Sequence, residues 1–223
     1  LKDLPVTSSV QAVQGVTYPA LSKIADNDDK FAEGYLRIMR LLGFVLFPVM
    51  LGFVAVASDM FLLLLGPKWM PTGPYFEILA LSGLAYPLAV VSYNVLKSKS
   101  DGRVILRLEV VKRVIMTAVL AYTIPRGVES VAWGMPAMAA VEFLLNRGSA
   151  MRYVATSWRA LCAVLLPSLL LSGVMFGAVY MLQPYIAELH VALRLGVDIV
   201  AAVVVYVALA AVLNLRALRE GID

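Results

Sequence analysis

Apolar stretches of about 20 residues, separated by short polar connections, run along the whole chain. A helix needs roughly 20 residues to cross a hydrocarbon core about 30 Å thick, because each residue adds about 1.5 Å. The pattern therefore predicts an all-α, polytopic helical membrane protein with about seven transmembrane helices. The predicted spans cover residues 5–24, 41–57, 75–96, 104–124, 128–145, 158–182 and 195–215.

Polar and special residues predict where these helices start, stop and bend. An amphipathic helix is expected over residues 31–40, before the second span. Ser58-Asp59 resembles an N-cap for a short interfacial helix over residues 60–65, which Gly66-Pro67 would end. Five of the predicted spans contain a proline, which favours bent helices in transporters and receptors alike: Pro19, Pro48, Pro87, Pro136 and Pro167.

Composition supports the membrane assignment. Apolar residues make up 61% of the chain and charged residues 15%, with a mean hydropathy of +0.84. A soluble domain of 223 residues could not bury so much apolar surface. The net charge of +4 is therefore interpreted as a sign of membrane topology and not of nucleic-acid binding.

Candidate catalytic chemistry is missing from the sequence. The single cysteine, Cys162, excludes an internal disulfide. No His, Cys or carboxylate cluster has metal-ligand spacing, and no nucleophile or phosphate-loop motif is present. We therefore predict no catalytic residue, no metal and no cofactor.

Basic residues are divided unequally between alternate connections. One set includes the C-terminal tail and holds Lys23, Lys30, Arg37, Arg40, Lys97, Lys99, Arg103, Arg147, Arg152, Arg159, Arg216 and Arg219. The opposite set holds only Lys2, Lys68, Arg126 and Arg194. Basic residues collect on the cytoplasmic side, so we predict a multi-pass protein of the bacterial inner membrane with a cytoplasmic C-terminus. The chain opens without a Met, and we expect further spans to precede it.

Charged residues interrupt the fourth predicted span. The apolar part that follows them, residues 114–124, covers about 16 Å, which places Lys112 and Arg113 near the bilayer midplane. Glu109 shares their helical face at i, i+3 and i+4 spacing. Charges at this depth face a water-filled cavity or a partner. They predict either a cationic cavity site for a phosphate group or a self-satisfied ion cluster with snorkelling side chains.

Polar residues also mark other predicted spans. Gln11, Gln14 and Tyr18 lie on one face of the first span, where they line a hydrophilic cavity or form interhelical hydrogen bonds. Both interpretations stay open. Glu77 and Asp198, near the outer ends of the third and seventh spans, are interpreted as interface residues.

Five segments in order match the sequence motifs of one family. They are LP and VTYPALSKI at 4–5 and 16–24, PVMLG at 48–52, LLGPKW at 64–69, ILALSG at 78–83 and RLEVVK at 107–112. On these motifs the first half of the chain resembles the C-terminal portion of bacterial polysaccharide and lipopolysaccharide flippases. These proteins form part of the multidrug/oligosaccharidyl-lipid/polysaccharide exporter superfamily.

The resemblance implies a two-lobe exporter that works by alternating access and is not an enzyme. Residues 1–150 would supply five spans of the C-terminal lobe, and residues 151–223 two additional helices and a cytoplasmic tail. The partners would be membrane lipids, a missing N-terminal lobe and an undecaprenyl-pyrophosphate-linked oligosaccharide, which would move to the periplasmic leaflet. Residues expected to line the cavity are Lys112, Arg113, Glu109, Gln11 and Gln14.

Two other functions remain alternatives. A membrane-embedded glycosyl or acyl transferase acting on a lipid-linked sugar would need a cluster of acids, His or metal ligands at one interface. A drug or ion exporter of the same superfamily would carry acidic rather than basic residues at the midplane. Glu109 stands where the family's motif often has a neutral polar residue, and it either lowers the local positive potential or pairs with a coupling cation.

Overall fold

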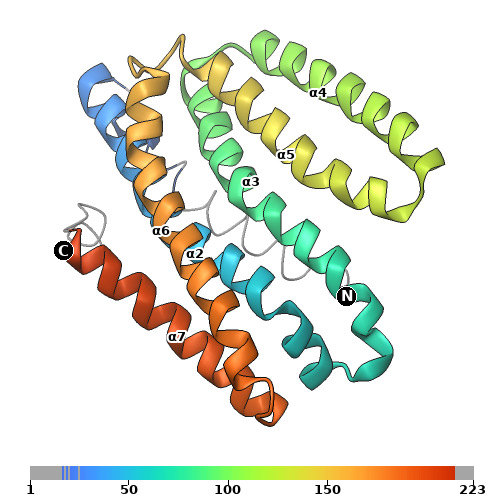
Figure 1. Cartoon of the computed structure of the whole chain (residues 1–223). Helices are drawn as coiled ribbons and strands as arrows, with labels where there is room; N and C mark the ends of the chain where they lie inside the picture. Colours follow the sequence, from blue (N-terminus) through green and yellow to red (C-terminus); the bar gives the residue numbers. More distant parts are fainter. Residues whose placement is uncertain (1–16, 18, 20, 25, 214–223) are drawn as a thin grey trace.

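A computed structural model of the chain describes residues 17, 19, 21–24 and 26–213, and within them it contains helices and no strand (Figure 1). The long helices are α2 (Asp28–Leu64), α3 (Gly73–Lys99), α4 (Gly102–Thr123), α5 (Val128–Ala150), α6 (Trp158–Ile186) and α7 (Val191–Val212). Two short 3-10 helices, η1 (Pro67–Thr72) and η2 (Ile124–Arg126), lie between them. The predicted all-α class is confirmed.

Five helical segments of the described part are long and apolar enough to cross a membrane: α2, η1 with α3, α5, α6 and α7. The prediction of a polytopic membrane protein is therefore confirmed. Helix α4 differs from the other predicted spans. Its 22 residues measure about 33 Å, which is long enough to cross a membrane. Most of the charged residues of α4 lie in its first half, and α4 is not among the five apolar segments. Most of the first predicted span, 5–24, lies outside the described residues.

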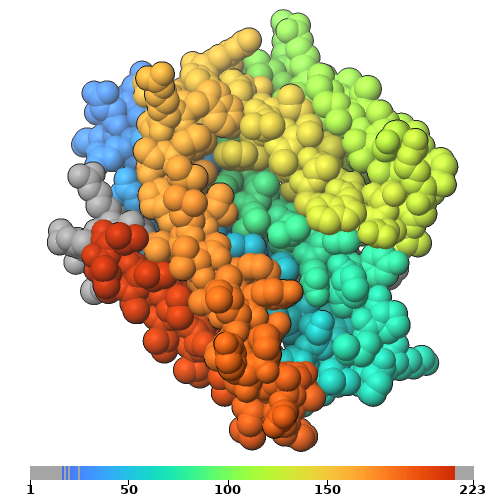
Figure 2. Space-filling model, viewed as in Figure 1, coloured from blue at the N-terminus to red at the C-terminus, as the bar shows by residue number. Residues whose placement is uncertain are grey.

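Successive long helices run in opposite directions (Figure 1). Helix α3 packs along α5, and α2 packs against both α3 and α6. Helix α7 lies on α6 and α2, while α4 packs mainly on α5. Figure 2 shows α4 at one edge of the molecule and α7 at the opposite edge. These two helices are the least covered by the rest of the chain.

The alternating directions bring the basic connections together. The start of α2, the α3–α4 connection and the α5–α6 connection lie at one end of the bundle, and the other connections lie at the opposite end (Figure 1). This arrangement is the one that the predicted orientation requires. The assignment of the basic end to the cytoplasm stays a prediction.

Helix α2 corrects the sequence prediction over its whole length. It runs for 37 residues, so the separate helices predicted over 31–40 and 60–65 are wrong as separate elements. Its N-cap is Asn27, whose Oδ1 accepts from the Lys30 amide at 3.0 Å. Asp59 caps no helix, because its carboxylate binds Arg194 of α7 instead. The chain leaves α2 at Gly66, whose φ of 83° suits glycine alone.

A hydrogen bond joins α7 to α2 next to the proline inside α2. Pro48 has no amide hydrogen, so the Phe44 carbonyl four residues earlier loses its helical partner. The Tyr206 hydroxyl of α7 donates to that carbonyl at 2.7 Å, and the rings of Phe44 and Tyr206 lie 5.2 Å apart. A backbone group in lipid must find a partner inside the protein, and here a tyrosine supplies it.

Candidate functional site

Helix α4 concentrates charge in the first half of its length. It carries Arg103, Arg107, Lys112 and Arg113 against one acid, Glu109, for a net charge of +3. Lys112 and Arg113 are the eleventh and twelfth of its 22 residues, so they lie at its centre. Several cations on one helix can bind an anionic group through charge-assisted hydrogen bonds.

Lys112 is the covered cation of this helix. Its residue surface is 7% exposed, its ammonium pairs with Glu109, and the ammonium lies 4.7 Å from the centre of the Tyr93 ring on α3. Tyr93 also lies beside Lys97, at 5.0 Å from ring centre to ammonium. This placement favours the ion-cluster interpretation for Lys112, because Glu109 and an aromatic face already stabilise its charge.

Arg113, Arg107 and Arg103 are the exposed cations of α4, and the first two lie nearest to Lys112 in the sequence. The Arg113 side chain is 74% exposed, and its Nη2 lies 4.0 Å from Glu109 Oε2, at the limit of an ion pair. Arg107 is also exposed. Glu109 therefore pairs with both Lys112 and Arg113, as the i+3 and i+4 spacing requires, but it lies much closer to Lys112.

A cavity of about 420 Å³ opens between α4 and α5 near the basic end of the bundle. Arg107 of α4 and Arg152, just after α5, line it together with Ser149. Apolar side chains form the rest of its wall, including Leu108 and Leu144. Two guanidinium groups and a hydroxyl beside an apolar wall suit a phosphate group attached to a lipid.

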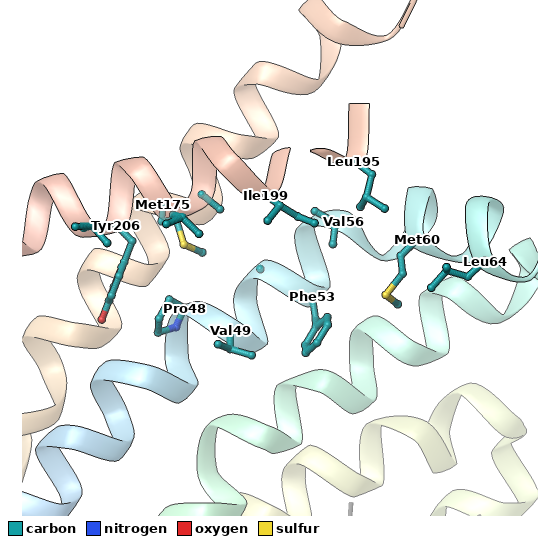
Figure 3. A pocket seen from close by; sticks show the side chains of 14 residues that line it. Pro48, Val49, Phe53, Val56, Met60, Leu64, Met175, Leu195, Ile199 and Tyr206 are labelled. Atoms are coloured by element: carbon teal, nitrogen blue, oxygen red, sulfur yellow. The ribbon is translucent and has the colours of Figure 1, made fainter. Parts of the chain in front are cut away.

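A second cavity, between α2, α6 and α7, is apolar. This groove has a volume of about 520 Å³, and Figure 3 shows Phe53 and Val56 of α2, Met175 of α6 and Ile199 of α7 around it. No charged side chain lines it. Its chemistry excludes a polar head group.

Comparison with known proteins identifies relatives in surface-polysaccharide biosynthesis. Residues 1–74 match a family described as "Polysaccharide biosynthesis protein". The chain is 29% identical over 132 residues to "Uncharacterized membrane protein in cps region" of Klebsiella pneumoniae, covering 59% of this chain and 27% of that protein. It is 26% identical over 147 residues to the teichuronic acid biosynthesis protein TuaB of Bacillus subtilis (strain 168), covering 65% and 30%.

A third relative is the lipopolysaccharide biosynthesis protein WzxC of Escherichia coli (strain K12). It is 30% identical over 69 residues, which cover 31% of this chain and 14% of that protein. The chain is a relative of bacterial polysaccharide biosynthesis proteins. The resemblance that the sequence motifs indicated is thereby confirmed. The chain spans less than a third of the length of each of these three relatives. No solved structure matches it.

Two of the site residues predicted for this chain, Gln11 and Gln14, lie outside the described residues. Thr17, which follows them in the same predicted span, is buried and its hydroxyl accepts from Asn94 Nδ2 of α3 at 2.9 Å. The described residues hold no group of three or more His, Cys, Asp or Glu that could bind a metal.

Arg147 is a residue whose importance the sequence did not show. In the sequence pattern, Arg147 is only one of the basic residues in the connections between spans. In the structure it is completely buried at the end of α5. Its Nη2 donates to the Thr156 carbonyl at 2.6 Å and to the Thr156 hydroxyl at 2.8 Å. The rings of Tyr35 and Trp158 lie 5.3 and 5.6 Å from its guanidinium carbon. Arg147 therefore joins α2, α5 and the start of α6, and its role is structural.

Proposed function

We propose that this chain is part of a transporter that moves an undecaprenyl-pyrophosphate-linked oligosaccharide from the cytoplasmic to the periplasmic leaflet of a bacterial inner membrane. The names of the relatives, which refer to lipopolysaccharide and teichuronic acid biosynthesis, support a lipid-linked sugar as the substrate. In this proposal the protein acts by binding and by changing conformation, and it catalyses no bond-making step.

The net charge of +3 on α4 is the observation that carries the proposal. A pyrophosphate group carries its negative charge into a medium where water is scarce, and fixed guanidinium groups replace the lost hydration with charge-assisted hydrogen bonds. Arg107 and Arg113 are exposed on α4, which lies at one edge of the molecule (Figure 2), and a second lobe would lie beside this edge. Alternating access would then come from rocking of that lobe against α4.

The covered members of the cluster have a different role in the proposal. Glu109 and Tyr93 hold the Lys112 ammonium inside the bundle, so Lys112 raises the potential of the site without binding the substrate directly. Gln11 and Gln14 are proposed to complete the polar wall. Residues 1–150 would form five helices of one lobe, and residues 151–223 two additional helices.

Complementation of a gene deletion tests the role of the exposed cations. Arg107→Gln/Arg113→Gln removes two exposed charges, of which only Arg113 has an ion pair among the described residues, with Glu109 at 4.0 Å. Charge-assisted hydrogen bonds contribute about 1.5–3 kcal/mol each, so we expect at least a tenfold loss of surface polysaccharide at normal membrane levels of the protein. The matched control is Arg126→Gln in η2, an exposed arginine at the opposite end of α4.

Three results separate the possibilities. Loss of polysaccharide in the double variant but not in Arg126→Gln supports the cationic site. Normal polysaccharide from the double variant rejects that site. If the deletion itself leaves surface polysaccharide unchanged, the transport proposal fails and a drug or ion exporter becomes the better explanation.

A further inference from the structure

Helix α7 contains a carboxylate that is buried within the membrane-spanning part of the bundle. Asp198 is 0% exposed, and neither of its carboxylate oxygens has a hydrogen-bond partner in the described part of the chain. It lies seven residues after the start of α7 at Val191, about 10 Å along the helix. The sequence placed Asp198 near the outer end of its span but did not predict this burial. A buried charged carboxylate without a partner is strongly unfavourable, so this side chain needs a ligand.

Three polar side chains lie close enough to Asp198 to affect its charge: Asp59 from α2, Gln183 from α6 and Arg194 from α7 itself. Arg194 is engaged with Asp59, and Gln183 has one of its two amide hydrogens engaged, which leaves one neutral donor and no cation for Asp198. Arg194 donates from Nε to Asp59 Oδ2 at 2.5 Å and also from Nη2 to Asp59 Oδ1. Gln183 Nε2 donates to the Ala55 carbonyl of α2 at 2.8 Å.

The cluster therefore lacks one positive charge. Two carboxylates, Asp59 and Asp198, share one guanidinium, Arg194, which leaves a net charge of −1 among groups that are largely covered. In a low-dielectric environment such a charge binds a cation or a proton. No group of three or more acidic, His or Cys ligands lies in the described part of the chain, so the cluster does not suit a multivalent metal.

We propose that Asp198 and Asp59, with Gln183 beside them, bind one monovalent cation, either a proton or Na⁺. The bound cation neutralises the cluster where the outer end of α2 meets the α6–α7 hairpin. Without it, the two carboxylates repel each other across the α2–α7 contact and loosen that hairpin. This site is independent of the proposed transport function, because it depends only on the buried groups of α2, α6 and α7.

Infrared spectroscopy and thermal unfolding of the intact protein in lipid nanodiscs distinguish the two cations. If the ligand is a proton, the wild type at neutral pH shows a protonated-carboxyl band that shifts in D₂O and disappears in Asp198→Asn. If the ligand is Na⁺, the wild-type Tm rises with NaCl but not with choline chloride, and Asp198→Asn removes that rise. Glu188→Gln, which removes an exposed carboxylate from the α6–α7 connection, changes neither signal.

The result that overturns the proposal can be seen in the wild type alone. It is the absence of both a protonated-carboxyl band and a sodium-dependent rise in Tm. A band that persists in folded Asp198→Asn, without a sodium effect in the wild type, also overturns it. Because asparagine resembles a neutral aspartic acid, we expect this variant to fold with a Tm close to that of the cation-bound wild type. An ionised Asp198 paired with Arg194 would instead make Asp198→Asn less stable, with neither cation signal in the wild type.

Discussion

The hydrogen bond from Tyr206 to Phe44 predicts that the contribution of Tyr206 depends on Pro48. The Phe44 carbonyl would normally accept from the amide of residue 48, which proline lacks. Tyr206 is 6% exposed and supplies the missing donor at 2.7 Å. Tyr206→Phe removes the hydroxyl and keeps the ring, so the carbonyl loses its partner while the apolar packing remains.

The expected magnitude follows from the environment of that carbonyl. A buried acceptor left without a partner costs about 1–3 kcal/mol, and interhelical hydrogen bonds in membranes average about 0.6 kcal/mol with a maximum of about 1.7 kcal/mol. We therefore expect Tyr206→Phe to lower the free energy of unfolding by about 1–2 kcal/mol. In a Pro48→Ala background the amide of residue 48 reaches the carbonyl again, and the same change costs about 0.5 kcal/mol or less. The coupling between the two positions is thus about 1 kcal/mol.

Unfolding of the intact protein by SDS in mixed micelles measures this double-mutant cycle. The control is Tyr180→Phe, because Tyr180 is 65% exposed on α6 and its hydroxyl has no partner in the described contacts. It should leave the free energy of unfolding unchanged. The reasoning is refuted if Tyr206→Phe is equally destabilising with and without Pro48, because the freed carbonyl would then not be the reason for the bond.

Two further predictions concern stability. Gly66→Ala should lower the free energy of unfolding by about 1–3 kcal/mol, because the φ of 83° and ψ of 175° at this residue are nearly exclusive to glycine. Gly52→Ala is the control, because a Cβ added there meets no other atom within 4 Å, and it should be neutral or stabilising. Equal effects of the two changes in the SDS assay would contradict this. Ser92→Ala should cost about 1–2 kcal/mol, because the buried Ser92 hydroxyl is 3.0 Å from the Tyr35 hydroxyl. Ser130 is half-buried and its hydroxyl makes only a long hydrogen bond of 3.5 Å to the Arg126 carbonyl, so Ser130→Ala should stay within about 0.5 kcal/mol of the wild type. A Ser92→Ala variant as stable as Ser130→Ala would show that Tyr35 finds another partner.

The spans could be predicted wherever apolar length alone decides the structure. Helices α3, α5, α6 and α7 coincide with predicted spans because a run of that length and composition has few other stable environments. The continuity of α2 could not be predicted. Ser58-Asp59 has the local character of a cap, and the partner that Asp59 uses instead, Arg194, lies 135 residues away. A contact so distant leaves no local pattern.

In the candidate site, too, local spacing could be predicted from the sequence and distant contacts could not. Helical spacing correctly placed Glu109 next to both Lys112 and Arg113. The spacing could not show which cation is covered, because Tyr93 on α3 decides it. Likewise, Asp198 has no sequence neighbour that reveals its burial, which comes from α2 and α6 packing around α7.

The charge of α4 also bears on how the protein enters the membrane during synthesis. A Lys or Arg at the centre of an inserting helix costs about 2.5–3.5 kcal/mol, so Lys112 and Arg113 together oppose insertion of α4 alone by roughly 5–7 kcal/mol. Tyr93, which covers the Lys112 ammonium, belongs to α3 and leaves the ribosome first. We therefore expect α4 to insert more readily when α3 already lies beside it, because Tyr93 and Glu109 lower the cost of the Lys112 charge.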